Sequence, residues 1–172
     1  DFFNIEALYS TQNIQELNFN HEIKSIFKDI EINKIDGINI TNPYKTNIIS
    51  SMISLSDDAK KINAINCIYK KENKLIGENT DWYGFIKSLN HNNIDLQDYN
   101  IIIIGAGGVS RSIIYSLQKK GIKNFQIYNR TNINDFKINE QTYSTLEFEK
   151  LEKNIFPNTL IINCTSLGVI EN

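Results

Sequence analysis

The fold of this 172-residue chain is decided by one stretch, Asn100-Ile101-Ile102-Ile103-Ile104-Gly105-Ala106-Gly107-Gly108-Val109-Ser110. Its apolar start predicts a buried strand, the glycines predict a tight turn, and residues 111–120 predict a helix that Gly121 ends. A second strand is predicted over 125–128. A strand, a glycine-rich turn, a helix and a further strand within about 30 residues are typical of a Rossmann-type dinucleotide-binding domain.

The glycine-rich turn offers a specific chemistry. Residues without side chains let a pyrophosphate approach the backbone, and the N–H groups and dipole of the following helix stabilise its charge. Ser110 replaces the third glycine of the usual pattern and is small enough for close helix packing. The alternative is a tight strand-to-helix turn that binds no ligand.

The end of the second predicted strand bears on the choice of nucleotide. Proteins that bind NAD carry an acidic residue there, about 20 residues after the turn, to hold the ribose hydroxyl. This chain has Asn129-Arg130-Thr131 instead. Arg130 can pair with a 2′-phosphate and no carboxylate repels one, so the sequence favours NADP over NAD. The alternative for Arg130 is an ordinary exposed arginine.

Composition excludes several classes of protein. Hydrophobic residues make up 41% of the chain and charged residues 22%, as in globular proteins. The longest apolar run, 101–104, is far below the ~20 residues of a membrane-spanning helix. A net charge of −2 gives no basic surface for nucleic acid. We therefore expect a cytoplasmic protein with no nucleic-acid or membrane partner and no metal site, in which Cys67 and Cys164 stay reduced.

The first half predicts a smaller α/β arrangement that ends in a connecting helix. The polar run at 91–93 breaks the pattern and marks the best domain boundary. The expected elements, in order, are a helix over 21–30, a short strand after Asp36-Gly37, a helix over 43–53 capped by Asn42 with Pro43 in its first turn, a helix from Ser56 to Ile62, a hairpin from 66–69 and 74–76, and a helix over 82–90.

Two charged residues stand out in this half. Lys45 falls in the first turn of the predicted helix 43–53, where the helix dipole disfavours an ammonium. A lysine at this position therefore does not stabilise the helix. It is either a proton-transfer group in a cleft or a solvated lysine. Asp81 precedes a helix and is either its cap or part of a site. Polar residues at predicted strand ends can converge on a hydroxylated ligand near both; they are Thr41, Asn66, Asn79 and Thr80.

Six segments of the sequence resemble motifs of the shikimate/quinate dehydrogenase family, and they occur in the same order and with the same spacing. They are residues 37–45, 63–67, 77–85, 105–111, 129–131 and 161–168. The resemblance runs from about residue 35 to residue 168. It implies an α/β fold with a substrate-binding domain over 1–81, a connecting helix and linker over 82–96, and a Rossmann-type, doubly wound NADP-binding domain over 97–172. It also implies that both domains are incomplete in this sequence.

The resemblance implies the reversible NADPH-dependent reduction of 3-dehydroshikimate to shikimate. Lys45 and Asp81 match the family's proton-transfer pair, and Thr41, Asn66 and Thr80 match positions that bind the small-molecule substrate. The positions expected to bind the cofactor are Gly105, Ala106, Gly107, Gly108, Val109, Asn129, Arg130, Thr131 and Thr165. The protein is expected to be a monomer or a homodimer.

Two departures from the family pattern keep alternatives open. Residues 132–134 supply no second basic residue after Arg130, which weakens the preference for NADP. The stretch 132–144 lacks the helix that a Rossmann domain should have there. The alternatives are an NAD-preferring quinate/shikimate dehydrogenase and a non-catalytic nucleotide-binding relative.

Overall fold

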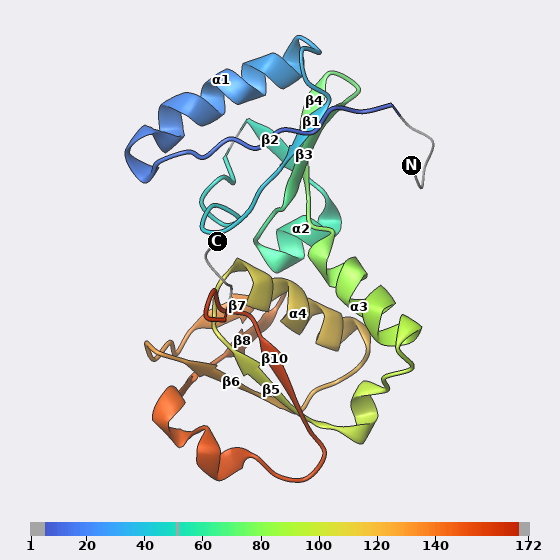
Figure 1. Cartoon of the computed structure of the whole chain (residues 1–172), viewed down its shortest axis with the longest axis vertical. Helices are drawn as coiled ribbons and strands as arrows, with labels where there is room; N and C mark the ends of the chain where they lie inside the picture. Colours follow the sequence, from blue (N-terminus) through green and yellow to red (C-terminus); the bar gives the residue numbers. More distant parts are fainter. Residues whose placement is uncertain (1–5, 51, 169–172) are drawn as a thin grey trace.

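Each half of the chain is built around its own four-stranded sheet (Figure 1). This computed structural model describes residues 6–50 and 52–168. The division into two α/β halves, the second with a parallel sheet, confirms the predicted fold class. In the described part of the chain, no helix is both long enough and apolar enough to cross a membrane.

The first sheet has the strand order β1-β3-β4-β2. The hairpin of β3 (Cys67–Lys71) and β4 (Lys74–Glu78) is confirmed, and its two turn residues, Glu72 and Asn73, both have positive φ, which suits the right-handed twist of a two-residue hairpin. β1 (Gly37–Asn39) pairs antiparallel with β3, and β2 (Ile53–Leu55) pairs parallel with β4.

Helices on this sheet follow the predicted apolar spacing. α1 (Phe19–Glu31) follows a single 3-10 turn, η1 (Glu16–Asn18), and buries Phe27 and Ile30 against the sheet. α2 (Asp57–Ile62) begins where the Ser56 hydroxyl accepts from the Ala59 N–H at 3.3 Å. It ends at Asn63, whose φ of 54° is the left-handed conformation that stops a helix.

The helix predicted over 43–53 is wrong. Residues 42–48 form consecutive turns, and Ile53 already belongs to β2. The Lys45 carbonyl, which in a helix would accept from Ile49, accepts instead from the N–H of Ile65 at 2.8 Å. A tertiary hydrogen bond therefore replaces a helical one in a segment whose Thr, Asn and Ile residues are weak helix formers. Lys45 therefore lies outside any helix of its own segment, and the dipole of a helix over 43–53 does not act on it.

The second sheet is parallel, with the strand order β10-β5-β6-β9. Counted along the chain within this half, the order read from β9 is 3-2-1-4, the order of a Rossmann half-domain. The chain therefore reverses direction across the sheet between β5 and β10, which is where such folds bind ligands. The strands are β5 (Asn100–Ile104), β6 (Phe125–Asn129), β9 (Leu146–Glu147) and β10 (Thr159–Asn163).

α4 (Gly108–Lys119) covers one face of this sheet and begins three residues before the predicted start. Ile113, Ile114 and Leu117 pack with the strands in the larger core. The opposite face buries Ile102 and Tyr128 beneath two 3-10 turns, η3 (Phe148–Lys150) and η4 (Glu152–Asn154). The 132–144 stretch holds no helix, as predicted; it forms a hairpin of β7 (Phe136–Ile138) and β8 (Gln141–Tyr143).

The connecting helix, α3 (Asp81–His91), packs along α4 and is followed by η2 (Leu96–Asp98). α4 lies between the second sheet and the first half of the chain, beside α2 and α3 (Figure 1). The Tyr115 hydroxyl on α4 donates to Asp58 on α2 at 2.6 Å, and Lys119 lies 3.5 Å from the same carboxylate. Burial, followed by this hydrogen bond to Asp58, raises the pKa of Tyr115, so its hydroxyl stays protonated and donates.

We expect Tyr115→Phe to lower the free energy of unfolding by about 1–2 kcal/mol, because a partly buried hydroxyl that donates to a carboxylate is lost without a change in ring packing. Urea unfolding measures the change. Lys150→Met, which removes only the exposed ion pair with Glu147, is the control and should give no measurable change. Equal stability of Tyr115→Phe and the parent protein would contradict this role for the contact.

Candidate active site

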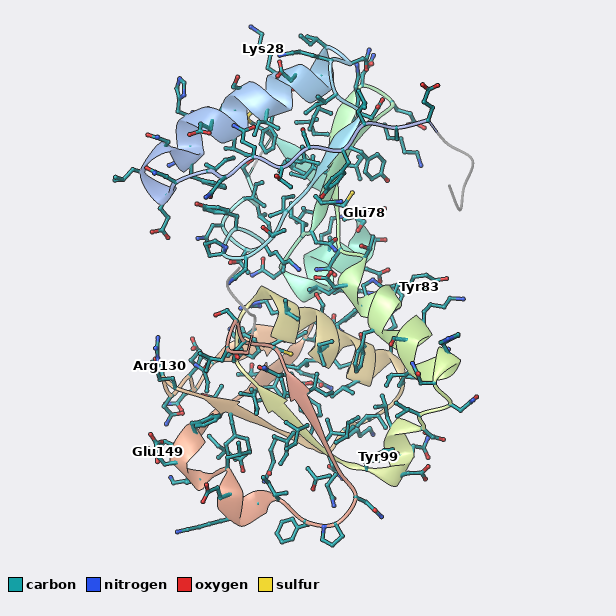
Figure 2. All side chains as sticks on the ribbon, in the orientation of Figure 1. Lys28, Glu78, Tyr83, Tyr99, Arg130 and Glu149 are labelled. Carbon is teal, nitrogen blue, oxygen red and sulfur yellow. The ribbon has the colours of Figure 1, made fainter. Side chains whose placement is uncertain are left out.

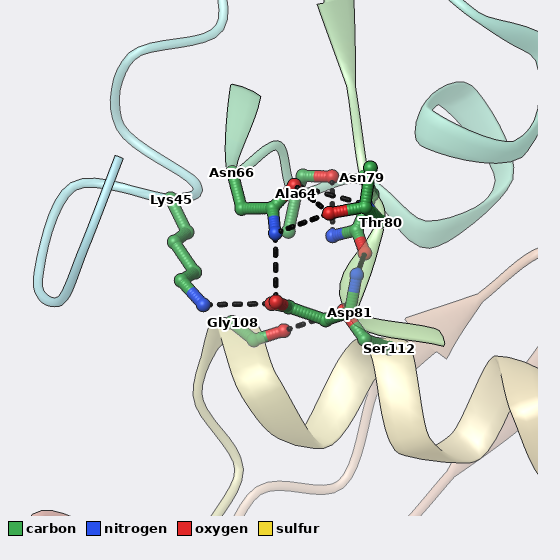
Figure 3. Close-up of polar contacts among 8 residues, drawn as sticks. All are labelled: Lys45, Ala64, Asn66, Asn79, Thr80, Asp81, Gly108 and Ser112. Atoms are coloured by element: carbon green, nitrogen blue, oxygen red, sulfur yellow. Dashed lines mark hydrogen bonds and ion pairs between the residues drawn. The ribbon is translucent and has the colours of Figure 1, made fainter. Parts of the chain in front are cut away.

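An ion pair between Lys45 and Asp81 lies at the junction of the two halves (Figure 3). The Lys45 Nζ is 2.7 Å from Oδ2 of Asp81. The side chains are 14% and 25% exposed, so both are largely shielded from water and still reachable by a ligand. Asp81 is the first residue of α3, after the N-cap residue Thr80, and its two carboxylate oxygens accept from Lys45 and Asn66.

Contacts just before and within the turn segment 42–48 hold the backbone that carries Lys45. The Ile40 N–H donates to the carbonyl of Asn66 at 2.8 Å just before the segment. Within it, the Tyr44 hydroxyl donates to the Ile14 carbonyl at 2.6 Å, and the Tyr44 ring stacks on Phe19 with 4.3 Å between centroids. These contacts fix the backbone at Lys45 although no helix surrounds it.

The side-chain amide of Asn66 orients the carboxylate. Its Nδ2 donates to Oδ1 of Asp81 at 2.7 Å and to the Thr80 hydroxyl at 3.0 Å, while its Oδ1 accepts from the Thr80 N–H at 2.9 Å. Asp81 therefore holds an ammonium on one oxygen and an amide on the other, which leaves it a single orientation. Thr41 lies exposed just after β1 and is not part of this group of hydrogen bonds.

The glycine-rich turn between β5 and α4 meets this group directly. A Cβ on Gly108 would lie 2.9 Å from the Lys45 Cβ, so the absence of a side chain there lets the turn approach the lysine. Gly105 has a φ of 102°, and a Cβ on it would meet Thr165 Cγ2 at 2.9 Å. Ser110, which replaces the third glycine of the pattern, is buried in the packed turn, where its hydroxyl donates to the Gly105 carbonyl at 2.7 Å.

The turn fits the pyrophosphate of a dinucleotide. The first N–H groups of α4 have no acceptors within the helix and carry its positive dipole end. Apart from its two chain neighbours, no heavy atom of residues 6–50 and 52–168 lies within 4 Å of a Cβ built on Gly107, so a side chain there would point into open space. Ala106 and Val109 flank it, and both are half-buried.

The other expected cofactor residues lie at carboxyl ends of the parallel strands. At the end of β6, Asn129 Nδ2 donates to the Thr131 carbonyl at 2.8 Å, and Arg130 is exposed (Figure 2). After β10, the Thr165 hydroxyl donates to Asn163 at 2.7 Å and accepts from the Leu167 N–H at 3.2 Å. This edge of the sheet is where doubly wound folds bind nucleotides.

Sequence reasoning missed the polar group behind the ion pair. Asn79, 4% exposed, accepts from the Asp81 N–H at 3.1 Å and from the Ser112 hydroxyl on α4 at 3.0 Å. Asn79 was recognised only as one of several polar residues at strand ends. Ser112 gave no signal, because its partner lies on another element and in the other half of the chain.

Two family models match the chain. The model described as the shikimate dehydrogenase substrate binding domain matches residues 2–68, and the one described as shikimate / quinate 5-dehydrogenase matches residues 88–169. A curated relative, the shikimate dehydrogenase (NADP(+)) of Caldicellulosiruptor bescii, is 34% identical over 99% of this chain and 59% of its own length. The chain thus spans about three fifths of that relative.

Solved structures agree with this result. Shikimate dehydrogenase 1 from Peptoclostridium difficile superposes with a TM-score of 0.82 at 31% identity, covering 99% of this chain and 61% of that one. Shikimate 5-dehydrogenase from Listeria monocytogenes, solved in complex with shikimate and NAD, has a TM-score of 0.67 at 28% identity and covers 86% of this chain and 56% of that one.

Cys164 lies directly behind the glycine turn, where its N–H donates to the Ile104 carbonyl at 2.8 Å. Burial raises the pKa of its thiol to about 11. Both Cys164 and Cys67 are free thiols, in line with the expectation that no disulfide joins them.

We expect iodoacetamide to alkylate Cys164 at pH 8 about a hundredfold more slowly in the native protein than in the unfolded chain, because only the thiolate reacts and its pKa is raised from 9.0 to about 11. The native rate should climb as the pH rises towards 11. Peptide mass spectrometry measures both rates. Equal rates in the two states at pH 8 would show that the thiol is not shielded.

Proposed function

This chain belongs to the shikimate/quinate dehydrogenase family, and from that premise we propose that the protein catalyses the reversible NADPH-dependent reduction of 3-dehydroshikimate to shikimate. One observation carries the proposal. The Lys45–Asp81 ion pair lies against the glycine turn at Gly108, so a proton-transfer group and a pyrophosphate site share one location. The substrate and the activity are proposed for the whole protein. This chain spans about three fifths of the length of the relative from Caldicellulosiruptor bescii.

In this mechanism the residues of the chain handle the proton. NADPH, when bound, supplies the hydride that adds to the C3 carbonyl carbon. The Lys45 ammonium donates a proton to the oxygen of that carbonyl, and in the reverse direction its amine accepts the proton of the alcohol. Asp81, 2.7 Å from Nζ, holds the lysine in place and orients the substrate hydroxyl.

Substrate binding is proposed for Thr41, Asn66 and Thr80. The hydroxyls of Thr41 and Thr80 belong to exposed residues, and the Asn66 amide already contacts the Asp81 carboxylate. Hydroxyls and amides are suited to a small molecule that carries several hydroxyl groups and a carboxylate. The hydrogen bonds of Asn66 and Thr80 beside the ion pair support this role for these two residues, and the resemblance to the family supports it for Thr41.

Cofactor binding is proposed for the turn residues 105–109, for Asn129, Arg130 and Thr131, and for Thr165. The open space at Gly107 and the free N–H groups of α4 support binding of the pyrophosphate. The exposed guanidinium of Arg130 supports binding of the 2′-phosphate.

An NAD-preferring quinate/shikimate dehydrogenase is the second candidate. Arg130 is the single basic residue in 129–134, and the relative from Listeria monocytogenes was solved with NAD. A non-catalytic relative is the third, and it differs from the other two because Lys45 would then have no effect on turnover.

The proposal extends to the organisation of the protein. The substrate-binding domain would span 1–81, the connecting helix and linker 82–96 and the NADP-binding domain 97–172. A cytoplasmic location is proposed in keeping with the two free cysteines. The protein would act as a monomer or a homodimer on a small-molecule substrate.

We expect Lys45→Ala in the full-length protein to lower kcat by about 10²- to 10⁴-fold, because the proton-transfer group is lost. The dissociation constant for NADP should stay within about twofold. Absorbance of NADPH during oxidation of shikimate measures the rate, and fluorescence titration measures binding. Lys60→Ala, which removes an exposed lysine, is the control and should keep the parent kcat. Turnover of Lys45→Ala within a few-fold of the parent would remove Lys45 from the mechanism.

We expect Arg130→Ala to raise KM for NADP about tenfold or more, because a charge-assisted contact with the 2′-phosphate is lost. KM for NAD, which has no such phosphate, should stay within about twofold and serves as the matched control. Initial rates with each cofactor give both values. An equal change in KM for the two cofactors would mean that Arg130 does not contact the 2′-phosphate.

A further inference from the structure

The buried hydroxyl of Ser112 links α4 to the site from behind. Ser112 is fully buried, and its Oγ donates to Oδ1 of Asn79 at 3.0 Å. The carbonyl of Gly108 in its own helix is a poorer partner at 3.5 Å. A hydroxyl has one hydrogen to donate, so the shorter contact identifies Asn79 as its acceptor.

Both the oxygen and the nitrogen of the Asn79 side-chain amide make hydrogen bonds. Its Oδ1 accepts from Ser112 and from the Asp81 N–H at 3.1 Å, and its Nδ2 donates to the Ala64 carbonyl at 3.0 Å (Figure 3). The amide is thus held by α4, by the start of α3 and by the segment that leads into β3. Asn79 is only 4% exposed, so water cannot readily replace a hydrogen-bond partner that a mutation removes. Loss of such a partner therefore costs stability.

α4 is therefore linked to both members of the ion pair, directly to Lys45 and through Asn79 to Asp81. Its first residue, Gly108, lies against the Lys45 side chain, and Ser112, one turn later, reaches the backbone of Asp81 through Asn79. The same helix begins at the glycine turn. Its position is thereby linked to the lysine, to the aspartate and to the turn that faces the open space.

We propose that Ser112 is a positioning residue, which acts through Asn79 to hold Asp81 in register with Lys45 and with the cofactor turn. This inference rests on the proposed function. When the hydroxyl is removed, Asn79 keeps the Asp81 N–H but loses its tie to α4. The start of α3 then moves more freely relative to the helix that carries the turn, and small displacements of reacting groups are costly in rate.

Ser116 provides a matched control. It is also fully buried on α4, and its hydroxyl donates to the Ser112 carbonyl at 2.8 Å and lies 3.0 Å from the Trp82 carbonyl, so its hydrogen-bond partners are neither Asn79 nor Asp81. Ser112→Ala and Ser116→Ala remove the same atom from the same helix. A purely structural role for Ser112 predicts the same kinetics for both variants.

The test measures kcat and KM in the full-length protein. Ser112→Ala should lower kcat about tenfold and leave KM for NADP within about twofold, whereas Ser116→Ala should keep kcat within about twofold. Both should lower Tm by similar amounts. Added to Lys45→Ala, Ser112→Ala should change the residual rate less than twofold, because the pair it positions is already broken. Equal kcat in the two serine variants, or an undiminished effect on Lys45→Ala, would overturn the proposal.

A second readout does not depend on turnover. Amide hydrogen exchange at Asp81, followed by NMR, should be about tenfold faster in Ser112→Ala than in the parent and unchanged in Ser116→Ala. If the parent protein does not oxidise shikimate, the proposed function fails and this exchange rate alone decides the positioning role. If the parent is active and exchange at Asp81 is unchanged, the positioning role fails and the function stands.

Discussion

Two charges that are largely removed from water need further hydrogen bonds to offset the lost hydration, and this constraint governs the centre of the molecule. Lys45 occupies one carboxylate oxygen of Asp81 and Asn66 the other. The Asp81 N–H is held by Asn79. The strands and turns of the first half deliver these groups from separate points of the chain, so the pair depends on the whole half and not on one motif.

Steric limits join this centre to the second half. A side chain at position 108 would push the Lys45 stem, and one at position 105 would meet Thr165. The glycine pattern thus serves two purposes in one turn: it exposes the backbone of a helix N-terminus, and it lets that turn approach the lysine. Contacts of α4 with α2 and α3, including Tyr115 with Asp58, keep the two halves in this arrangement.

Predictions succeeded where local chemistry alone sets the structure. The Ser56 cap, the apolar strand at 101–104 and the hairpin around residues 72–73 follow from neighbouring residues, and each was confirmed. The helix over 43–53 failed because the Lys45 carbonyl bonds to Ile65, which is distant in sequence. A capping asparagine and a proline give the same local pattern whether or not such a partner exists.

The sequence by itself determined the Rossmann half, its glycine turn and the candidate residues Lys45 and Asp81, because residue spacing and backbone freedom are properties of short segments. Only the tertiary structure decided that Lys45 and Asp81 are 2.7 Å apart, that Gly108 lies against the lysine, and that Ser112 reaches Asp81 through Asn79. Hydrogen bonds and close contacts between distant segments depend on how the sheets and helices pack, and spacing along one chain does not encode those distances.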